Sequence, residues 1–370
     1  MNLTFTEEQD ELRATVRQFF ADKSDEQAVR AHMNLPSGYD GDLWTQMAEQ
    51  IGLAGLIVPE EHGGAGFGYK ELCIVMEEMG RVLACAPYLA TSVTATNALL
   101  QCADEATRNS LLPSIATGET IATLAYVESS GCWDLSEVNM RAQSKDDGWL
   151  LDGEKGWVLD GVAADVILVV ARTETGLEVF RVEGDAEGLT RSDLPTLDLT
   201  RKLAKLSFAS TPATKISEGD QSEALERVLA LTVVALAAEQ VGGAQACLDM
   251  AVEYASTRLQ FGRPIGSYQA IKHKCADMLV EVEFAKTAAY HACFSAADEP
   301  GELLEAASLA KAYCSEVYFH AAAENIQIHG GMGFTWEHPA HLYFKRAKAS
   351  ALLFGDAAHH REALATIVGL

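Results

Sequence analysis

The sequence is short of positive charge and lacks the residue spacings of a metal site. Its 370 residues include 28 lysines and arginines against 53 aspartates and glutamates, which gives a formal net charge of −25. Because a nucleic-acid-binding face needs an excess of lysine and arginine to neutralise phosphates, this class of function is excluded. The eight cysteines are scattered without a Cys-x-x-Cys pair, and the histidines show no metal-ligand spacing. We therefore expect no metal site, and we interpret the cysteines as buried thiols in a reducing cytoplasm.

Signals for export and for membrane insertion are also missing. The first eight residues, MNLTFTEE, contain no basic region followed by an apolar run. No stretch reaches the roughly 20 apolar residues that a membrane-spanning helix needs. These absences predict a cytoplasmic protein without a membrane span. A length of 370 residues exceeds one ordinary core, so two or three packed units are expected.

Helical patterning dominates the N-terminal part of the chain. Thr6 and Gln9 have the spacing of a capping box, and apolar residues follow at spacings of four and three over residues 12–19. Similar apolar periodicity recurs over residues 72–83 and 93–115. We expect this part to be all helical.

Short β-like runs replace that pattern between residues 120 and 214. Tryptophan-containing runs lie on both sides of Asp152-Gly153, a pair of residues that is typical of a two-residue hairpin turn. Residues 166–170, VILVV, form an apolar run of buried-strand length. This segment predicts a compact β unit with a hairpin at Asp152-Gly153.

Helical patterning then returns after a polar linker. A long run over residues 228–254 contains Gly242 and Gly243, and we expect these glycines to allow close contact with another helix. Apolar residues at spacings of four and three over 271–285 are typical of a helix in a bundle, and a further helix is expected over 303–328. The predicted fold is mostly α with a central β domain, divided as residues 1–117, 118–216 and 222–370.

Two stretches in the last third of the chain predict a binding site. Residues 257–269, TRLQFGRPIGSYQ, put an arginine, an aromatic residue and a glycine between two helices, and residues 327–334, QIHGGMGF, end a helix on two glycines. A guanidinium group offers paired donors to phosphate oxygens, and glycines let backbone amides approach an anion closely. Singly, each stretch is explained equally well as a helix stop. Together they indicate a diphosphate site.

This pair of stretches resembles the acyl-CoA dehydrogenase family. The similarity extends to residues 44–80, which look like the family's N-terminal domain, and to residues 346–348, RAK. It implies a helical domain, a β-barrel or sandwich, and a C-terminal four-helix bundle. It also implies FAD as cofactor, with its adenosine diphosphate part held largely across a subunit interface. The implied contacts are Arg258, Gln260, Phe261, Gln269, Gln327, Gly330 and Gly331.

The resemblance further implies a reaction on an acyl-CoA thioester. Such an enzyme removes a proton beside the thioester carbonyl and passes a hydride to the flavin, with electron-transfer flavoprotein as the expected acceptor. The protein must supply a base, normally a carboxylate whose pKa is raised by burial. The two family locations for this base fall at Phe354 and at or beside Thr232, and neither residue can accept the proton.

Two nearby carboxylates are candidates for a relocated base. Asp356 follows Phe354 by two residues, but its position before the last helix is also typical of an N-cap. Glu239 lies about two turns beyond Thr232 on the same helix face, where it could equally be a buried structural or interface carboxylate. The catalytic residue therefore stays open.

The β domain departs from the family as well. Residues 157–160 read WVLD, so the expected tryptophan is present but Leu159 replaces a hydroxyl residue that would hydrogen-bond to the flavin. Loss of that bond costs roughly 1 kcal/mol or more.

Three hypotheses for the function of the chain remain. The chain is a base-lacking subunit of an α2β2 enzyme, with a steroid-CoA or another bulky acyl-CoA as substrate by analogy; a self-sufficient homotetramer with a relocated carboxylate; or a non-catalytic acyl-CoA-binding scaffold.

Overall fold

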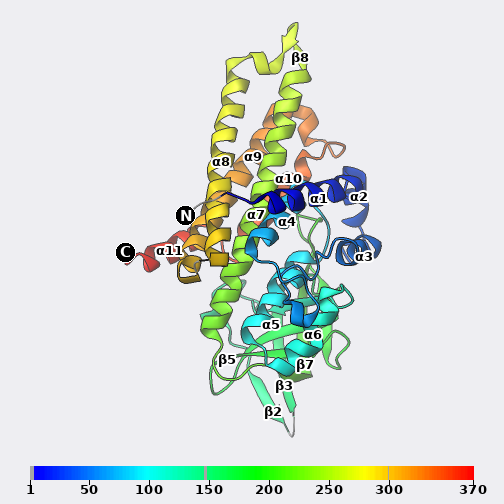
Figure 1. Cartoon of the computed structure of the whole chain (residues 1–370), viewed down its shortest axis with the longest axis vertical. Helices are drawn as coiled ribbons and strands as arrows, with labels where there is room; N and C mark the ends of the chain where they lie inside the picture. The colour runs from blue at the N-terminus through cyan, green and yellow to red at the C-terminus, as the bar shows by residue number, and fades with distance from the viewer. Residues whose placement is uncertain (1–3, 146–147, 299) are drawn as a thin grey trace. The chain divides into compact units, whose positions relative to one another are not determined.

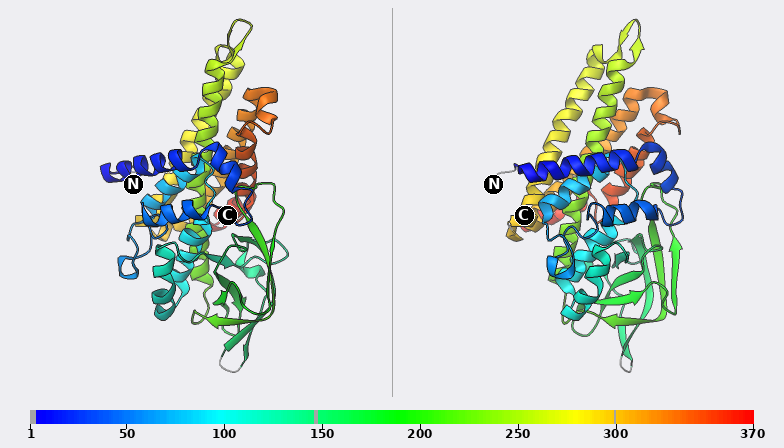
Figure 2. Two further views of the ribbon diagram at one scale, coloured as in Figure 1. Left: turned by 90° about the vertical axis from the view of Figure 1, so that its right-hand side faces the viewer. Right: turned by 45° about the vertical axis from the view of Figure 1, so that its right-hand side comes forward.

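The computed structural model describes residues 4–145, 148–298 and 300–370, which form two compact units (Figures 1 and 2). The helical unit consists of Met1–Ala31, Tyr69–Ala84 and Val233–Leu370, and the sheet unit of His32–Gly68 and Cys85–Thr232. The predicted fold class, mostly α with a central β domain, is confirmed. The division into three domains stays a prediction. Among the described residues, none of the helices combines the length and apolar character that a membrane crossing requires.

Three long helices dominate the helical unit. They are α7 (Ser222–Thr257), whose residues from Val233 onward belong to this unit, α8 (Gln269–Asp298) and α9 (Leu303–His329), in agreement with the predicted periodicity. A two-stranded ribbon of β8 (Leu259–Gln260) and β9 (Arg263–Pro264) joins α7 to α8 at the top of Figure 1. The remaining elements are α1 (Glu7–Lys23), α2 (Glu26–His32), α4 (Tyr69–Arg81), α10 (Ala340–Leu352) and α11 (Ala357–Ile367), with the short 3-10 segments η4 (Ile265–Ser267), η5 (Pro300–Glu302) and η6 (Gly330–Phe334).

Helix α1 begins with the predicted capping box. The Thr6 hydroxyl accepts a hydrogen bond from the Gln9 amide at 3.3 Å, and the Thr6 amide donates to Gln9 Oε1 at 3.0 Å. Both backbone donors would otherwise lack a partner within the helix. The reciprocal bonds therefore fix where the helix starts.

The glycines of α7 allow the close helix contacts that the sequence predicts. A Cβ added to Gly242 would overlap the carbonyl oxygen of Glu77 on α4, and one added to Gly243 would overlap the Tyr318 ring on α9. From the α4 side, a Cβ on Gly80 would overlap the carbonyl oxygen of Glu239. Helices α4 and α7 thus touch backbone to backbone, which fixes their spacing.

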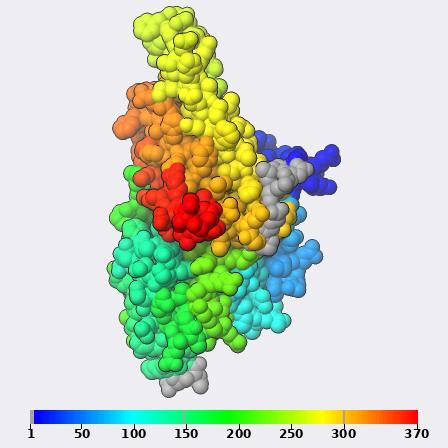
Figure 3. All heavy atoms as spheres, turned by 90° about the vertical axis from the view of Figure 1, so that its left-hand side faces the viewer, coloured from blue at the N-terminus to red at the C-terminus, as the bar shows by residue number. Residues whose placement is uncertain are grey.

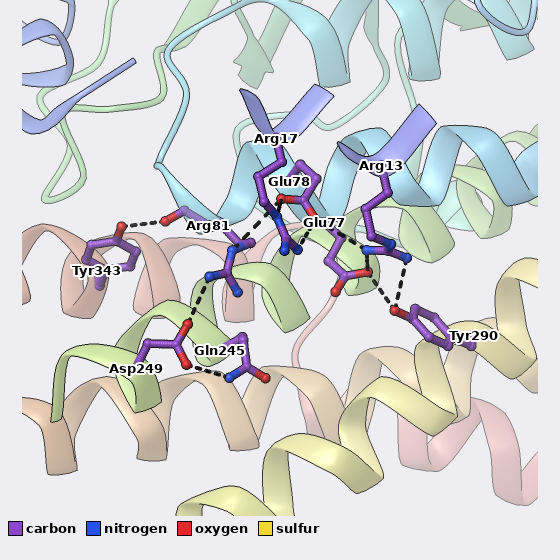
Figure 4. Close-up of polar contacts among 9 residues, drawn as sticks. All are labelled: Arg13, Arg17, Glu77, Glu78, Arg81, Gln245, Asp249, Tyr290 and Tyr343. Carbon is purple, nitrogen blue, oxygen red and sulfur yellow. Dashed lines mark hydrogen bonds and ion pairs between the residues drawn. The ribbon is translucent and has the colours of Figure 1, made fainter. Parts of the chain in front are cut away.

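Ion pairs hold α4 against its other neighbours (Figure 4). Two arginines of α1 reach two buried carboxylates of α4: Arg13 Nη1 lies 2.6 Å from Glu77 Oε2, and Arg17 Nη2 lies 2.7 Å from Glu78 Oε1. The hydroxyl of Tyr290 on α8 donates to Glu77 Oε2 at 2.8 Å. Burying an unpaired carboxylate costs free energy, so Glu77 and Glu78 need these partners at their buried positions. Helix α4 is therefore fixed to α1, α7 and α8.

A seven-stranded sheet forms the core of the sheet unit. Its order is β1, β4, β5, β7, β3, β2, with β6 paired to β7; β1 and β4 are parallel, and the other strand pairs among the described residues are antiparallel. The predicted apolar run is confirmed as β4, which is buried over its first six residues. The strands are β1 (Ala122–Ala125), β2 (Ala142–Lys145), β3 (Gly148–Leu159), β4 (Val166–Arg172), β5 (Leu177–Glu183), β6 (Leu189–Asp193) and β7 (Leu203–Lys215). The helical elements are α3 (Gly41–Glu49), η1 (Glu60–His62), the π-helix η2 (Leu89–Ala95), α5 (Thr96–Cys102), α6 (Glu105–Ala116) and η3 (Leu135–Glu137).

The predicted hairpin at Asp152-Gly153 is wrong, because β3 runs straight through these residues. Gly153 has a φ of 133°, and the pairing of β3 with β7 shifts register between Leu151 and Gly153. Asp152 Oδ1 accepts a hydrogen bond from the Ser210 amide at 2.6 Å. The glycine therefore serves a β-bulge rather than a turn, since both features use the same left-handed backbone.

The interpretation of all the cysteines as buried thiols is also wrong. Cys73 and Cys293 form a disulfide bond between α4 and α8, with Cα atoms 6.4 Å apart and 220 residues between them in the sequence. Cys132 is an exposed free cysteine. The sequence does not reveal the disulfide, because no spacing rule relates two cysteines that only the packing of helices brings together.

Candidate functional site

The first predicted stretch forms the end of α7 and the β8–β9 ribbon. Phe261 and Gly262 at the tip have φ values of 54° and 78°, and such positive values fit the two-residue turns that join twisted strands. The guanidinium carbon of Arg263 lies 3.9 Å from the ring centroid of Tyr268, whose hydroxyl donates to the Gln260 carbonyl at 3.1 Å. The ribbon is braced by its own residues, and it presents Phe261 93% exposed.

The second predicted stretch ends α9 and turns at two glycines, Gly330 and Gly331. Gly330 follows the last helical residue, His329, with a φ of 62°, a conformation that favours glycine. A Cβ added to Gly330 or Gly331 would meet no described atom within 4 Å, apart from its chain neighbours. Close packing within the chain therefore does not explain these two glycines, and the space beside them is open.

An aromatic stack brings the two stretches together. The Tyr254 ring of α7 stacks on the His329 ring of α9, with centroids 4.3 Å apart and planes 24° from parallel. Tyr254 precedes Arg258 by one helical turn, and His329 directly precedes Gly330. His329 Nδ1 is fixed in turn by the Asn325 carbonyl at 2.8 Å. Arg258 and the glycine corner are thus held at the same end of the helical unit.

The predicted binding residues share one further property, which is exposure. On the face drawn in Figure 3, the end of the α7–α8 pair stands clear of the other helices of its unit. Gln269 starts α8 beyond the ribbon, and Gln327 lies one turn before the glycine corner. The exposed set is Arg258, Gln260, Phe261, Gln269, Gln327, Gly330 and Gly331. These groups are therefore available to something outside the helical unit.

Glu239, one candidate base, lies in the interior of the helical unit. Its Oε1 accepts a hydrogen bond from Arg346 Nη1 at 3.0 Å, and both side chains are buried. A buried carboxylate paired in this way has a structural explanation, because each charge compensates the other in a medium of low dielectric constant. The catalytic role of Glu239 stays a prediction.

Asp356, the other candidate, caps a helix as the sequence indicates. Its Oδ1 accepts a hydrogen bond from the His359 amide at 2.9 Å at the start of α11. Backbone hydrogen bonds from His359 and Ala358 lower the pKa of Asp356, and this direction is opposite to the one that suits a base near neutral pH. The geometry explains the residue as an N-cap.

Neither of the two residues at which the resemblance places the catalytic base is a carboxylate. Phe354 is buried in the turn between α10 and α11, with a φ of 58°. In the sheet unit, the buried hydroxyl of Thr232 donates to the Val228 carbonyl at 2.9 Å. Both positions are therefore used for packing and local hydrogen bonding.

Two residues that the sequence did not single out hold the Phe354 turn. Lys311 Nζ donates to the carbonyls of Ser350 and Gly355, both at 3.0 Å, and burial lowers its pKa to about 7. His360 Nε2 lies 3.0 Å from the Phe354 carbonyl, and burial lowers the pKa of His360 to about 4. Nothing in the sequence marks a lysine inside a helix as the partner of a turn some 40 residues away.

The sheet unit contains the stretch that the resemblance places near the flavin ring. Leu159 is buried, and its carbonyl accepts a hydrogen bond from the Thr123 hydroxyl at 2.6 Å. Glu128 Oε1 lies 3.0 Å from the buried Nζ of Lys155. Burial lowers the pKa of Lys155 to about 8, although the Glu128 charge acts in the opposite direction. The ion pair ties the loop after β1 to β3.

Comparison with known proteins agrees with this architecture. Models of the acyl-CoA dehydrogenase N-terminal, middle and C-terminal domains match residues 6–119, 123–210 and 223–369. Acyl-CoA dehydrogenase IpdE2 of Mycobacterium tuberculosis is 37% identical, over 95% of this chain and 94% of the relative. A structure of a variant of the Tcur3481–Tcur3483 steroid ACAD has a TM-score of 0.89 at 32% identity and covers 98% of both chains. The ChsE4–ChsE5 complex from Mycobacterium tuberculosis has a TM-score of 0.91 at 27% identity, over 100% of this chain and 99% of the other.

These likenesses define the fold as that of a flavoprotein oxidoreductase acting on CH–CH bonds. The chain belongs to the acyl-CoA dehydrogenase family. Membership does not by itself assign a role to each residue, because one fold supports several functions.

Proposed function

We propose that this chain is the base-lacking subunit of a heteromeric FAD-dependent acyl-CoA dehydrogenase. The reaction is the α,β-dehydrogenation of an acyl-CoA thioester. When bound, FAD supplies the hydride acceptor for this reaction. The helical unit binds and orients the diphosphate end of the cofactor. A second acyl-CoA dehydrogenase subunit provides the carboxylate that takes the proton beside the thioester carbonyl.

The observation that carries this proposal is the exposed end of the helical unit. A diphosphate is recognised by paired charged donors and by backbone amides that nothing shields. Arg258 is an exposed guanidinium, and the open corner at Gly330 and Gly331 leaves backbone accessible. The Tyr254–His329 stack holds the two together. The donors present therefore fit a diphosphate that belongs to an adjoining chain.

The missing base supports the assignment of this chain as one of two unlike subunits. Phe354 and Thr232 occupy the usual positions, while Glu239 is paired with Arg346 and Asp356 caps α11. A carboxylate that already accepts a charged donor, or that has a lowered pKa, is poorly suited to accept a proton near neutral pH. The proton acceptor is therefore expected in the partner.

The relatives suggest both a partner and a substrate class. The ChsE4–ChsE5 complex is by its description a complex of two named proteins, and the Tcur3481–Tcur3483 protein is described as a steroid ACAD. By analogy we propose an α2β2 assembly that acts on a steroid-CoA or another bulky acyl-CoA in the cytoplasm. Electron-transfer flavoprotein is the proposed electron acceptor.

Co-expression with a base-bearing homologous chain tests this function. The chain alone is expected to contain little flavin and to show no turnover, whereas the pair gains bound flavin and acyl-CoA-dependent flavin reduction. Arg258→Ala should weaken flavin binding by the pair about 10- to 100-fold, because a charged hydrogen bond contributes roughly 1.5–3 kcal/mol. Arg361→Ala is the matched control, since Arg361 is an exposed arginine of α11 paired with Glu316.

Other outcomes would favour the alternative functions. Full flavin occupancy and turnover by the chain alone would overturn the base-lacking role. Loss of that turnover in Glu239→Gln or Asp356→Asn would then identify a relocated base in a homotetramer. Thioester binding without flavin reduction in every combination would instead indicate a scaffold. Unchanged flavin affinity in Arg258→Ala would contradict the proposed diphosphate contact.

A further inference from the structure

A regular seam joins α4 to α8 within the helical unit. Three of its cross-links among the described residues follow one another, and successive partners on α4 meet successively earlier residues on α8, so the two helices run antiparallel along it. The cross-links are the ion pair Lys70–Asp298 at 2.6 Å, the disulfide Cys73–Cys293, and the hydrogen bond Tyr290–Glu77 at 2.8 Å. The disulfide lies between two non-covalent polar contacts. Because it is a covalent S–S bond, its state depends on oxidation.

The seam is connected to the exposed end described above. Helix α4 touches α7 backbone to backbone at Gly80 and Gly242, so the disulfide ties α8 to the pair of α4 and α7. The far end of α7 leads to Arg258, and the first residue of α8 is Gln269. A constraint on how α8 lies against α4 therefore acts on the two helices that carry the exposed residues.

We propose that Cys73 and Cys293 form a reversible redox pair that ties α8 covalently to α4 when oxidised and leaves the two helices joined by non-covalent contacts alone when reduced. The oxidant is a small-molecule disulfide such as glutathione disulfide. One protein thiol attacks it to form a mixed disulfide and releases one small thiol; the second protein thiol then displaces the other. The protein loses two electrons and two protons, and the two small thiols released carry them away.

The seam offers a route for this exchange even though both sulfurs are buried. Cys293 lies five residues before the end of α8 at Asp298, and helix ends open more readily than helix centres. The outermost cross-link is partly exposed, since Lys70 and Asp298 are 24% and 52% exposed. Opening of the last turn and a half of α8 brings Cys293 to solvent while the Tyr290–Glu77 bond keeps the helices in register.

The expected consequence is a change of rigidity rather than unfolding. In the reduced state the ion pair, the Tyr290 hydrogen bond and the backbone contact with α7 remain. Because a cross-link over a long loop mainly restricts the unfolded chain, its loss lowers stability without removing native contacts. Disulfides of cytoplasmic proteins, where they occur, are usually transient or redox-sensing, which fits a reversible link.

Counting reactive thiols in the full-length chain tests the proposal. After treatment with glutathione disulfide, denaturation and alkylation, the protein should take up no more than six alkyl groups, because eight cysteines less the bonded pair leave six and glutathione can also cap the exposed Cys132. Incubation with reduced glutathione should raise the count to eight and lower the melting temperature by about 5 °C or more. Hydrogen exchange of residues 290–298 should speed up in parallel.

Matched variants separate this redox pair from general effects of thiols. Cys73→Ser/Cys293→Ser should melt at the temperature of the reduced protein and show no further shift with redox state. Cys314→Ser, at a buried free cysteine of α9, should keep the full shift. The proposal is wrong if eight groups are taken up after oxidation, if six remain after reduction, or if the double variant still responds. None of these readouts needs flavin or a partner, so they do not depend on the proposed function.

Discussion

At the outer end of the helical unit, Arg258 and Gln327 are exposed beside two glycines at which an added Cβ would meet no described atom within 4 Å, apart from chain neighbours. In its interior, Glu239 and Lys311 are each held by partners within the chain. The two regions use polar groups in opposite ways. A buried charge must be compensated where it lies, so it contributes to the fold and is poorly available for chemistry. An exposed donor costs little and is free to bind. In this chain the end with the predicted binding residues is open, and the region expected to hold the base is closed.

The sharpest test of the closed interior is the ion pair between Glu239 and Arg346. Arg346→Met should lower the free energy of unfolding by about 3–5 kcal/mol, because a buried carboxylate loses its guanidinium partner. Urea unfolding measures the loss. Arg361→Met removes an exposed pair and should cost at most about 1 kcal/mol. Equal losses of unfolding free energy in both variants would show that water reaches the Glu239–Arg346 pair in spite of its burial.

His360 gives the interior a pH dependence. Its pKa lies near 4 in the folded chain, against 6.5 ordinarily, because burial disfavours the charged ring. The unfolded chain therefore takes up the proton first, so the contribution of His360 to stability is complete above pH 6.5 and falls by about 3 kcal/mol as the pH drops to 4. His360→Gln should flatten the unfolding free energy over this range. The same slope in variant and parent would contradict this cause.

Glycine substitutions compare the two regions directly. Gly242→Ala should cost about 2 kcal/mol, because its Cβ would overlap the Glu77 carbonyl oxygen. Gly331→Ala has open space around it and should change stability by no more than about 0.5 kcal/mol. Thermal unfolding of both variants decides the matter. A large loss in Gly331→Ala would mean that the corner is needed for folding rather than left free for a ligand.

The smallest effect is expected at the tip of the ribbon. Phe261→Asn keeps a residue that tolerates positive φ and removes a ring that is 93% exposed, so stability should change by less than about 0.5 kcal/mol. The melting temperature of the purified chain measures this change. A loss of more than 1 kcal/mol would show that the ring is packed in solution, and the comparison between an open end and a closed interior would fail.

Patterns that depend on neighbours in the sequence were predicted well. The capping box at Thr6, the N-cap at Asp356 and the close contact at Gly242 each follow from a few adjacent residues and a helical period. The order of helical, β and helical segments follows from the same periodicity. Arg258 and the predicted contacts around it come from the family resemblance of two short stretches, and their role in binding stays a prediction.

Features that join distant segments were missed or misread. Asp152-Gly153 has the local chemistry of a turn, but pairing of β3 with β7 on both sides of it makes it a bulge. The partner of Cys73 lies 220 residues away, and no signal marks Lys311 as the residue that holds the Phe354 turn. At Asp152-Gly153, tertiary contacts overrode the local turn signal. At Cys73 and Lys311, they supplied partners that the neighbouring residues do not indicate.

By itself the sequence determined the class of fold and the long helices, because periodicity and residue identity are local properties; the base-lacking role stays a prediction. Only the tertiary structure decided which polar groups are closed off and which remain open. Burial and pairing depend on segments that meet in space, such as Tyr254 on His329 and Arg346 on Glu239. That distinction rests on the cost of removing charge from water, which a linear sequence does not record.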